Sequence, residues 1–231
     1  MLEAIQLTKT YQNHTALHNL NLQVRPGEIY CLLGQNGAGK TTTINLFLGF
    51  TEASTGKAKI NGVEVKPGSH ETKAFVAYIP EVVMLYGNLN SLENLDYFSR
   101  LAGFKYSKSD LRHFLALAGL QQDAFHKPLA GYSKGMRQKV GIAIAIAKQA
   151  DVLLMDEPTS GLDPKATDEF TRTVKRLGEE GKAVLMATHD IFNAVNVGNR
   201  IGIMRRGELV HELPAGQVDA RQLQELYLET I

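Results

Sequence analysis

The chain has 231 residues and a net charge of +1, with 44% hydrophobic and 21% charged residues. This length suits one large domain or two small ones, and the charge excludes the strongly basic surface typical of nucleic-acid binding. No apolar run approaches the roughly 18 residues of a membrane span, Met1–Ile5 lacks a signal-peptide pattern, and the single Cys31 excludes an internal disulfide. We therefore expect a soluble, cytosolic protein that reaches a membrane only through a partner.

Short apolar segments and turns alternate at the start of the chain. The predicted strands here are Leu2–Leu7, Leu20–Val24, Ala58–Ile60 and Val63–Val65. Pro26-Gly27 is typical of a type II turn, and Asn61-Gly62 strongly indicates a hairpin between the last two strands. These segments predict a small antiparallel β subdomain at the N-terminus.

A glycine-rich segment, Gly34–Thr41, fits the phosphate-loop pattern G-x-x-x-x-G-K-[S/T]. It follows an apolar predicted strand, Ile29–Leu33, and precedes a predicted helix at Thr42–Leu48, which is the context the motif requires. Backbone amides of the loop and of the helix N-terminus would then face phosphate, with Lys40 at the β- and γ-phosphates. The candidate nucleotide-binding residues of this segment are Gly34, Asn36, Gly37, Ala38, Gly39, Lys40, Thr41 and Thr42.

The sequence changes character between about residues 85 and 149, where it contains no predicted strand. Ser91–Leu101 and Ser109–Ala118 are predicted helices, and Met136–Gln149, which is rich in Ala and Ile, is a third. An α-helical subdomain of about residues 85–149 is therefore expected to interrupt a core of about 1–84 and 150–231.

Four segments outside the helical insert predict further parallel strands, and they are Phe75–Ile79, Val152–Met155, Ala183–Ala187 and Arg200–Met204. The middle two are nearly all apolar, as expected of strands covered on both faces. A helix is expected to begin at Asp163-Pro164, and Val218–Leu228 is the last predicted helix. The fold class is α/β, a P-loop NTPase core with a mostly parallel sheet.

Two acids, Asp156 and Glu157, end one of these predicted strands. Open α/β sheets bind ligands at the carboxyl ends of their strands. Asp156 is positioned to hold Mg²⁺, and Glu157 to polarise an attacking water. The alternative is a strand that simply ends in solvated acids, and the phosphate loop favours the functional interpretation.

The segment Tyr132–Gln138, with the sequence YSKGMRQ, resembles the signature loop of ATP-binding cassette (ABC) ATPases, usually written LSGGQ. With this segment, the chain resembles an ABC nucleotide-binding domain over essentially all 231 residues, with the motifs in the family's order and spacing. Gly34–Thr42 matches the Walker A loop, and Asp156 and Glu157 match Walker B and the catalytic glutamate.

Four other positions match the same family. Tyr11 resembles the aromatic residue that stacks on adenine, and Tyr78–Glu81 resembles the segment that carries the Q-loop. Ser160–Asp163 resembles the D-loop, and His189 the switch histidine. Three of these residues have a plainer explanation: Tyr11 as a partly packed loop residue, Asp163 as a helix cap, and His189 as a cap of the following helix.

The resemblance implies an ATPase that uses ATP and Mg²⁺, with Glu157, His189 and Lys40 as catalytic residues. It implies that Thr41, Asp156 and Glu81 contact the metal. Nucleotide contacts beyond the phosphate loop would come from Tyr11, Ser133, Gly135 and Asp163. The signature lies far from the Walker motifs in one chain, so two chains, expected to be identical, would close head-to-tail around two ATP molecules.

Two positions depart from the family pattern. Glu81 replaces the Q-loop glutamine, so it either tunes Mg²⁺ binding and coupling or points away from the site. Lys134 replaces a glycine of the signature, and its ammonium is either near the phosphates of the opposing subunit or solvated.

One cassette without a membrane span, together with a full helical insert, predicts the ATPase subunit of a membrane transporter. It would lie on the cytoplasmic face of the membrane, bound to integral-membrane permease subunits. The signature and the Pro80-Glu81 pair resemble the exporter branch, which includes drug, sodium and polysaccharide exporters and the transporter for nitrous oxide reductase maturation. The alternative is a non-transport ABC ATPase that clamps a ribosomal, nucleic-acid or other soluble partner, but the charge of +1 leads us to expect no nucleic-acid partner.

Overall fold

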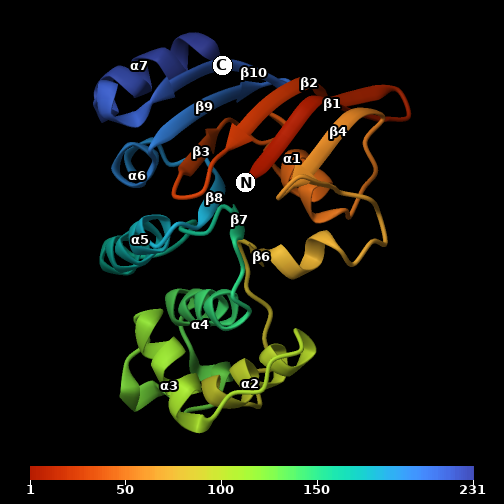
Figure 1. The fold of residues 1–231 in the computed structure, drawn as a ribbon. Coiled ribbons are helices and arrows are strands. Elements are labelled where there is room, and N and C mark those ends of the chain that lie inside the picture. The colour runs from red at the N-terminus through yellow and green to blue at the C-terminus, as the bar shows by residue number, and fades with distance from the viewer.

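Two β-sheets form the centre of the structure, a computed structural model that describes residues 1–231 (Figure 1). The larger sheet has the strand order β10-β9-β3-β8-β7-β6, and the smaller has the order β2-β1-β4-β5. The strands are β1 Leu2–Tyr11, β2 His14–Val24, β3 Ile29–Leu33, β4 Thr55–Ile60, β5 Val63–Glu64, β6 Val76–Ile79, β7 Val152–Asp156, β8 Ala183–Thr188, β9 Arg200–Arg205 and β10 Glu208–Pro214. The helices are α1 Lys40–Leu48, α2 Ser91–Leu101, α3 Lys108–Leu117, α4 Lys134–Ala147, α5 Pro164–Glu179, α6 Ile191–Val197 and α7 Ala220–Thr230.

The six-stranded sheet confirms the predicted parallel core. Its strands β6, β7, β8, β3 and β9 run parallel, and only β10 pairs antiparallel, at the edge beside β9. Every residue of β3, β7 and β8 is buried, which explains their continuous apolar sequences. The sequence analysis missed β10, because its exposed and half-buried residues alternate at the sheet edge.

The smaller sheet is antiparallel, as predicted, and the Asn61-Gly62 turn joins β4 to β5. Gly27 has a φ of 80° and follows Pro26, in agreement with the expected type II turn. Strands β1 and β2 extend further than predicted and pair up to Tyr11 and His14. These outer parts are mostly polar, and most of their residues are half-buried or exposed, so their sequence carries only a weak apolar signal of a strand.

Helices α2, α3 and α4 gather at one end of the molecule, beyond β6 and β7 (Figure 1). Asn90 and Ser107 form capping boxes that start α2 and α3. Helix α4 begins at Lys134, two residues earlier than predicted, because the Ser133 hydroxyl accepts a hydrogen bond from the Met136 amide. Helix α6, for which the sequence analysis gave no bounds, begins after Asp190 through the same kind of cap.

The core lies on both faces of the larger sheet. Alternate residues of β3 point to opposite faces, so Cys31 and Leu33 belong to one buried cluster while Tyr30 and Leu32 belong to the other. The first cluster includes apolar residues of the helices α2 to α6, and the second joins the sheet to α1 and the smaller sheet. The thiol of Cys31 is buried in the first cluster, where the side chain serves as a small hydrophobic residue.

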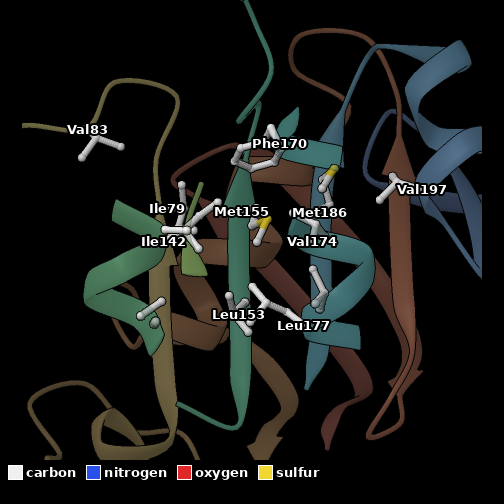
Figure 2. Packing of buried hydrophobic residues seen from close by; sticks show 14 of the residues in the cluster. Ile79, Val83, Ile142, Leu153, Met155, Phe170, Val174, Leu177, Met186 and Val197 are labelled. Carbon is white, nitrogen blue, oxygen red and sulfur yellow. The ribbon is translucent and has the colours of Figure 1, made fainter. Parts of the chain in front are cut away.

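Phe170 of α5 is almost fully buried in the same cluster as Met155 of β7 and Met186 of β8 (Figure 2). Replacing it with alanine is expected to lower the free energy of unfolding by about 3–5 kcal/mol, because a large cavity would remain. Urea denaturation measures this loss. The control is Phe192→Ala on the exposed side of α6, which should change stability by less than about 0.5 kcal/mol. Equal effects of the two changes would contradict this description of the core.

Candidate functional site

The phosphate loop is the tight connection between β3 and α1, between Leu33 and Lys40. Gly39 has a φ of 106°, and a Cβ atom there would lie 2.8 Å from the Ala16 carbonyl oxygen. A Cβ atom on Gly34 would lie 2.7 Å from the carbonyl oxygen of Met204. Both positions therefore require glycine, and the loop packs closely against its neighbours.

Lys40 places its ammonium group inside this loop. The side chain is 5% exposed, and its Nζ donates hydrogen bonds to the carbonyl oxygens of Gly34 at 2.5 Å and Gln35 at 3.3 Å. Nζ also lies 3.5 Å from Oε1 of Glu157, across the sheet edge. A buried cation held by carbonyls and one carboxylate can attract an anion such as a phosphate.

Asp156 and Thr41 lie together at the carboxyl end of β7. Burial raises the pKa of the Asp156 carboxyl above its usual range, while the adjacent Thr41 hydroxyl lowers it. The pair offers one carboxylate and one hydroxyl oxygen. Such hard donors suit Mg²⁺, which proteins usually bind through one or two carboxylates and the phosphates of a substrate.

Glu157 is held in a strained backbone conformation directly after β7. Its φ is 46°, and its amide donates to the Ala187 carbonyl oxygen of β8 at 2.9 Å. The carboxylate Oε2 lies 2.8 Å from Nδ1 of His189, while Oε1 faces Lys40. Strain of this kind concentrates at functional sites, and a fixed carboxylate beside a cation can act as a general base.

His189 does not cap the helix that follows it. That role belongs to Asp190, whose Oδ1 accepts a hydrogen bond from the Asn193 amide at 3.0 Å. The His189 ring is exposed and touches the Glu157 carboxylate. Of the two explanations for His189, the structure therefore favours the one that places it in the site.

Lys40, Thr41, Asp156 and Glu157 line one cleft of about 450 Å³, and His189 lies next to it through its contact with Glu157. Among the predicted residues, its lining includes Tyr11, Asn36, Gly37, Gly39, Lys40, Thr41, Thr42, Glu81, Asp156 and Glu157. The sequence analysis missed the lining residues His14, Ala16 and Gln35. Gln35 is a variable position of the loop motif, and the other two reach the cleft only because β2 extends beyond its apolar part. Tyr11 is half exposed and carries the Lys9 ammonium 4.7 Å from its ring centroid.

Three predicted nucleotide contacts lie away from the cleft of their own chain. Ser133 caps α4, and Asp163 caps α5 through a 2.9 Å hydrogen bond from the Ala166 amide. A Cβ atom on Gly135 would lie 3.2 Å from Cβ of Ala166, so the signature packs against the start of α5. One chain does not bring these residues to its phosphate loop.

The sequence profile of the ABC transporter family matches residues 17–160 of this chain. The chain belongs to the ABC transporter family. ABC cassettes bind and hydrolyse ATP, so this protein is an ATPase subunit of a transporter. No helix of this ABC protein has both the length and the apolar character needed to cross a bilayer.

Relatives with curated names support this membership. The chain is 34% identical over 222 residues to a bacitracin transport ATP-binding protein of Enterococcus faecalis, covering 96% of this chain and 71% of that protein. It is 31% identical to a linearmycin resistance ATP-binding protein of Bacillus subtilis, covering 91% of this chain and 68% of that protein.

Solved ABC structures share the fold. An ATP-binding subunit of an ABC transporter superposes with a TM-score of 0.84 at 29% identity, over 99% of this chain and 98% of that chain. A dimeric, post-hydrolysis ATP-binding cassette bound to ADP and phosphate superposes with a TM-score of 0.81 at 27% identity. This superposition covers 93% of this chain and 99% of that chain. The predicted fold class is confirmed.

Glu81 and Lys134, the two residues that depart from the ABC sequence pattern, lie close to each other in the structure. Glu81 lines the cleft and does not point away, and its Oε1 accepts a hydrogen bond from the Ser160 hydroxyl at 2.9 Å. Lys134 lies 3.6 Å from the same oxygen. The sequence analysis placed Lys134 either at the opposing subunit's phosphates or in solvent. The single chain adds a third neighbour to these two, because the fold brings the partly exposed Lys134 beside a carboxylate of its own chain.

Proposed function

We propose that this ATPase closes head-to-tail with a second copy of itself around two ATP molecules and thereby drives an integral-membrane permease. The observation that carries the proposal is the division of the site. Lys40 and Glu157 line one cleft and His189 contacts Glu157, whereas Ser133 and Gly135 lie elsewhere on the same chain. A second copy would supply the missing contacts. The dimeric ADP-bound cassette that this chain resembles supports this arrangement.

The main residues in and beside the cleft each have a proposed part in hydrolysis. Lys40 and the loop amides bind the phosphates, and Tyr11 stacks on adenine. Glu157 accepts a proton from the attacking water, while His189 orients the Glu157 carboxylate through their 2.8 Å contact. Closure of the dimer excludes bulk water, and the binding energy of ATP drives that closure.

The donor set beside the phosphate loop fits Mg²⁺. Thr41 and Asp156 would hold the ion, and Glu81 borders the same cleft. When bound, Mg²⁺ neutralises charge that develops on the β- and γ-phosphate oxygens. The Asp156 carboxylate would supply one protein oxygen to the ion, and the Thr41 hydroxyl would supply the second.

Chelation of Mg²⁺ by EDTA is expected to lower ATP hydrolysis by about 100-fold or more, because a bound cation contributes several kcal/mol to such reactions. The measurement is phosphate release with excess EDTA, followed by added MgCl₂, which should restore the rate. Asp156→Asn should need more MgCl₂ for half-maximal activity than the wild type. Hydrolysis that is indifferent to EDTA would remove the metal from the site.

We infer that the transporter is an exporter and that this subunit lies at the cytoplasmic face of the membrane. The relatives named for bacitracin transport and linearmycin resistance support export, because resistance to a compound is achieved when it is removed from the cell. We also propose one nucleotide-binding domain over residues 1–231, with a core of about 1–84 and 150–231 and a helical subdomain of about 85–149. A single buried apolar cluster extends from α2 and α3 to β7, which supports treating the core and the helical subdomain as one domain.

Affinity purification of the Glu157→Gln variant from detergent-solubilised native membranes, with ATP present, tests the transporter role. A co-purifying multi-span protein is the expected result, and the Lys40→Ala variant under the same conditions is the control for ATP dependence. Recovery only with ribosomes, nucleic acid or soluble proteins would overturn the transporter role in favour of an ATP-driven clamp.

A further inference from the structure

Three segments that lie far apart in the sequence meet at the carboxylate of Glu81. The Ser160 hydroxyl, in the loop before α5, donates to Oε1 at 2.9 Å. Nζ of Lys134, in the first turn of α4, lies 3.6 Å from the same oxygen. A Cβ atom on Gly161 would lie 3.7 Å from that Nζ, so Lys134 borders this loop as well.

Helix α4 also holds the backbone around Glu81. Lys134, Gln138 and Gly141 are spaced by four and three residues and therefore lie on one side of the helix. Gln138 is 1% exposed, and its Nε2 donates to the carbonyl oxygens of Pro80 at 3.2 Å and Glu81 at 3.1 Å. Position 141 faces Val83, whose side chain would lie 3.4 Å from a Cβ atom there. The segment 80–83 is thus fastened to α4 through both its main chain and a side chain.

Glu81 adds negative charge to a cleft that already holds two other carboxylates. Asp156 and Glu157 line the same cleft. Glu157 is paired with Lys40 at 3.5 Å, and the cation paired with Glu81 is Lys134. A polyphosphate that enters this cleft meets the Glu81 charge, and a cation beside Glu81 reduces the repulsion.

We propose that Lys134 is a positioning residue: it neutralises Glu81 and holds the Glu81 carboxylate between the signature helix and the Ser160 loop of the same chain. The inference rests on the proposed ATP site, and it assigns Lys134 a role within its own subunit. Lys134 acts on ATP through Glu81, without touching the nucleotide.

A double-mutant cycle measures this coupling through the equilibrium binding of ATP with Mg²⁺. At low salt, Lys134→Met should weaken binding about 2- to 5-fold, the range expected for a partly exposed ion pair. The same change made in a Glu81→Gln background should have no effect, because the charge that Lys134 offsets is gone. Lys134→Arg should bind ATP like the wild type, and added salt should shrink the Lys134→Met defect.

The matched control is Lys127→Met, which removes another helical-subdomain lysine from a 2.9 Å exposed pair with Asp123, away from the cleft. It should leave ATP binding unchanged. A Lys134→Met defect that is equally large in the Glu81→Gln background would overturn the proposal, since Lys134 would then act independently of Glu81. No defect in the wild-type background would overturn it as well.

Hydrogen–deuterium exchange provides a readout that needs no nucleotide. Lys134→Met should speed amide exchange in segments 79–84 and 158–162, whereas Lys127→Met should not. Unchanged exchange in both segments would refute the link between the loops. If the wild-type chain binds no ATP, the proposed function fails, but this exchange experiment still decides whether Lys134 holds the two loops.

Discussion

The Glu157→Gln variant is expected to bind ATP but to hydrolyse it about 100- to 10,000-fold more slowly than the wild type. General-base catalysis contributes a factor of this size, and an amide cannot accept the proton from water. Glutamine has nearly the same shape and keeps the backbone at φ 46°, so the fold should persist. Steady-state phosphate release and equilibrium ATP binding measure the two properties separately.

The same variant should also accumulate as an ATP-bound dimer, which size-exclusion chromatography detects, because closure is driven by ATP and released by hydrolysis. Glu229→Gln, on the exposed side of α7, is the control and should keep wild-type turnover. Turnover of Glu157→Gln within about twofold of the wild type would remove Glu157 from its proposed role.

The Lys40→Ala variant is expected to lose most of its affinity for ATP. A hydrogen bond to a charged group contributes about 1.5–3 kcal/mol, so the dissociation constant should rise about 10- to 100-fold. The change also removes the cation that faces the buried Oε1 of Glu157, which leaves that carboxylate to repel the phosphates. Isothermal titration with ATP and Mg²⁺ measures the loss.

Lys105→Ala serves as the control for Lys40→Ala, since Lys105 is exposed and lies in the loop between α2 and α3. It should bind ATP as the wild type does, and both variants should give the circular-dichroism spectrum of a folded protein. An unchanged affinity of Lys40→Ala would count against the whole phosphate site.

The cleft was largely predictable because its parts are encoded locally. Two buried strands are each followed at once by functional residues of the cleft. Leu33 of β3 leads into the phosphate loop, and Met155 of β7 leads into Asp156 and Glu157. Parallel strands place their carboxyl ends along one edge. The separation of Ser133 from the cleft was expected from the resemblance to ABC nucleotide-binding domains.

Edges and caps were less predictable. Strand β10 and the outer part of β2 are stabilised by pairing with β9 and β1, and their mostly exposed or half-buried residues give no continuous apolar signal. The role of His189 stayed open because a histidine before a short helix fits either a cap or a site. Two contacts separate these explanations: the Asn193 amide donates to Asp190, and the His189 ring contacts Glu157.

The sequence by itself therefore determined the fold class, the phosphate loop and the acids of the cleft, since glycine positions, apolar runs and capping residues act within a few neighbours. The tertiary structure alone decided which charges meet. Lys40 reaches Glu157, and Lys134 reaches Glu81, because strand order and the packing of α4 bring distant segments together. Such pairings depend on distances of a few ångströms between side chains, and local sequence patterns do not encode these distances.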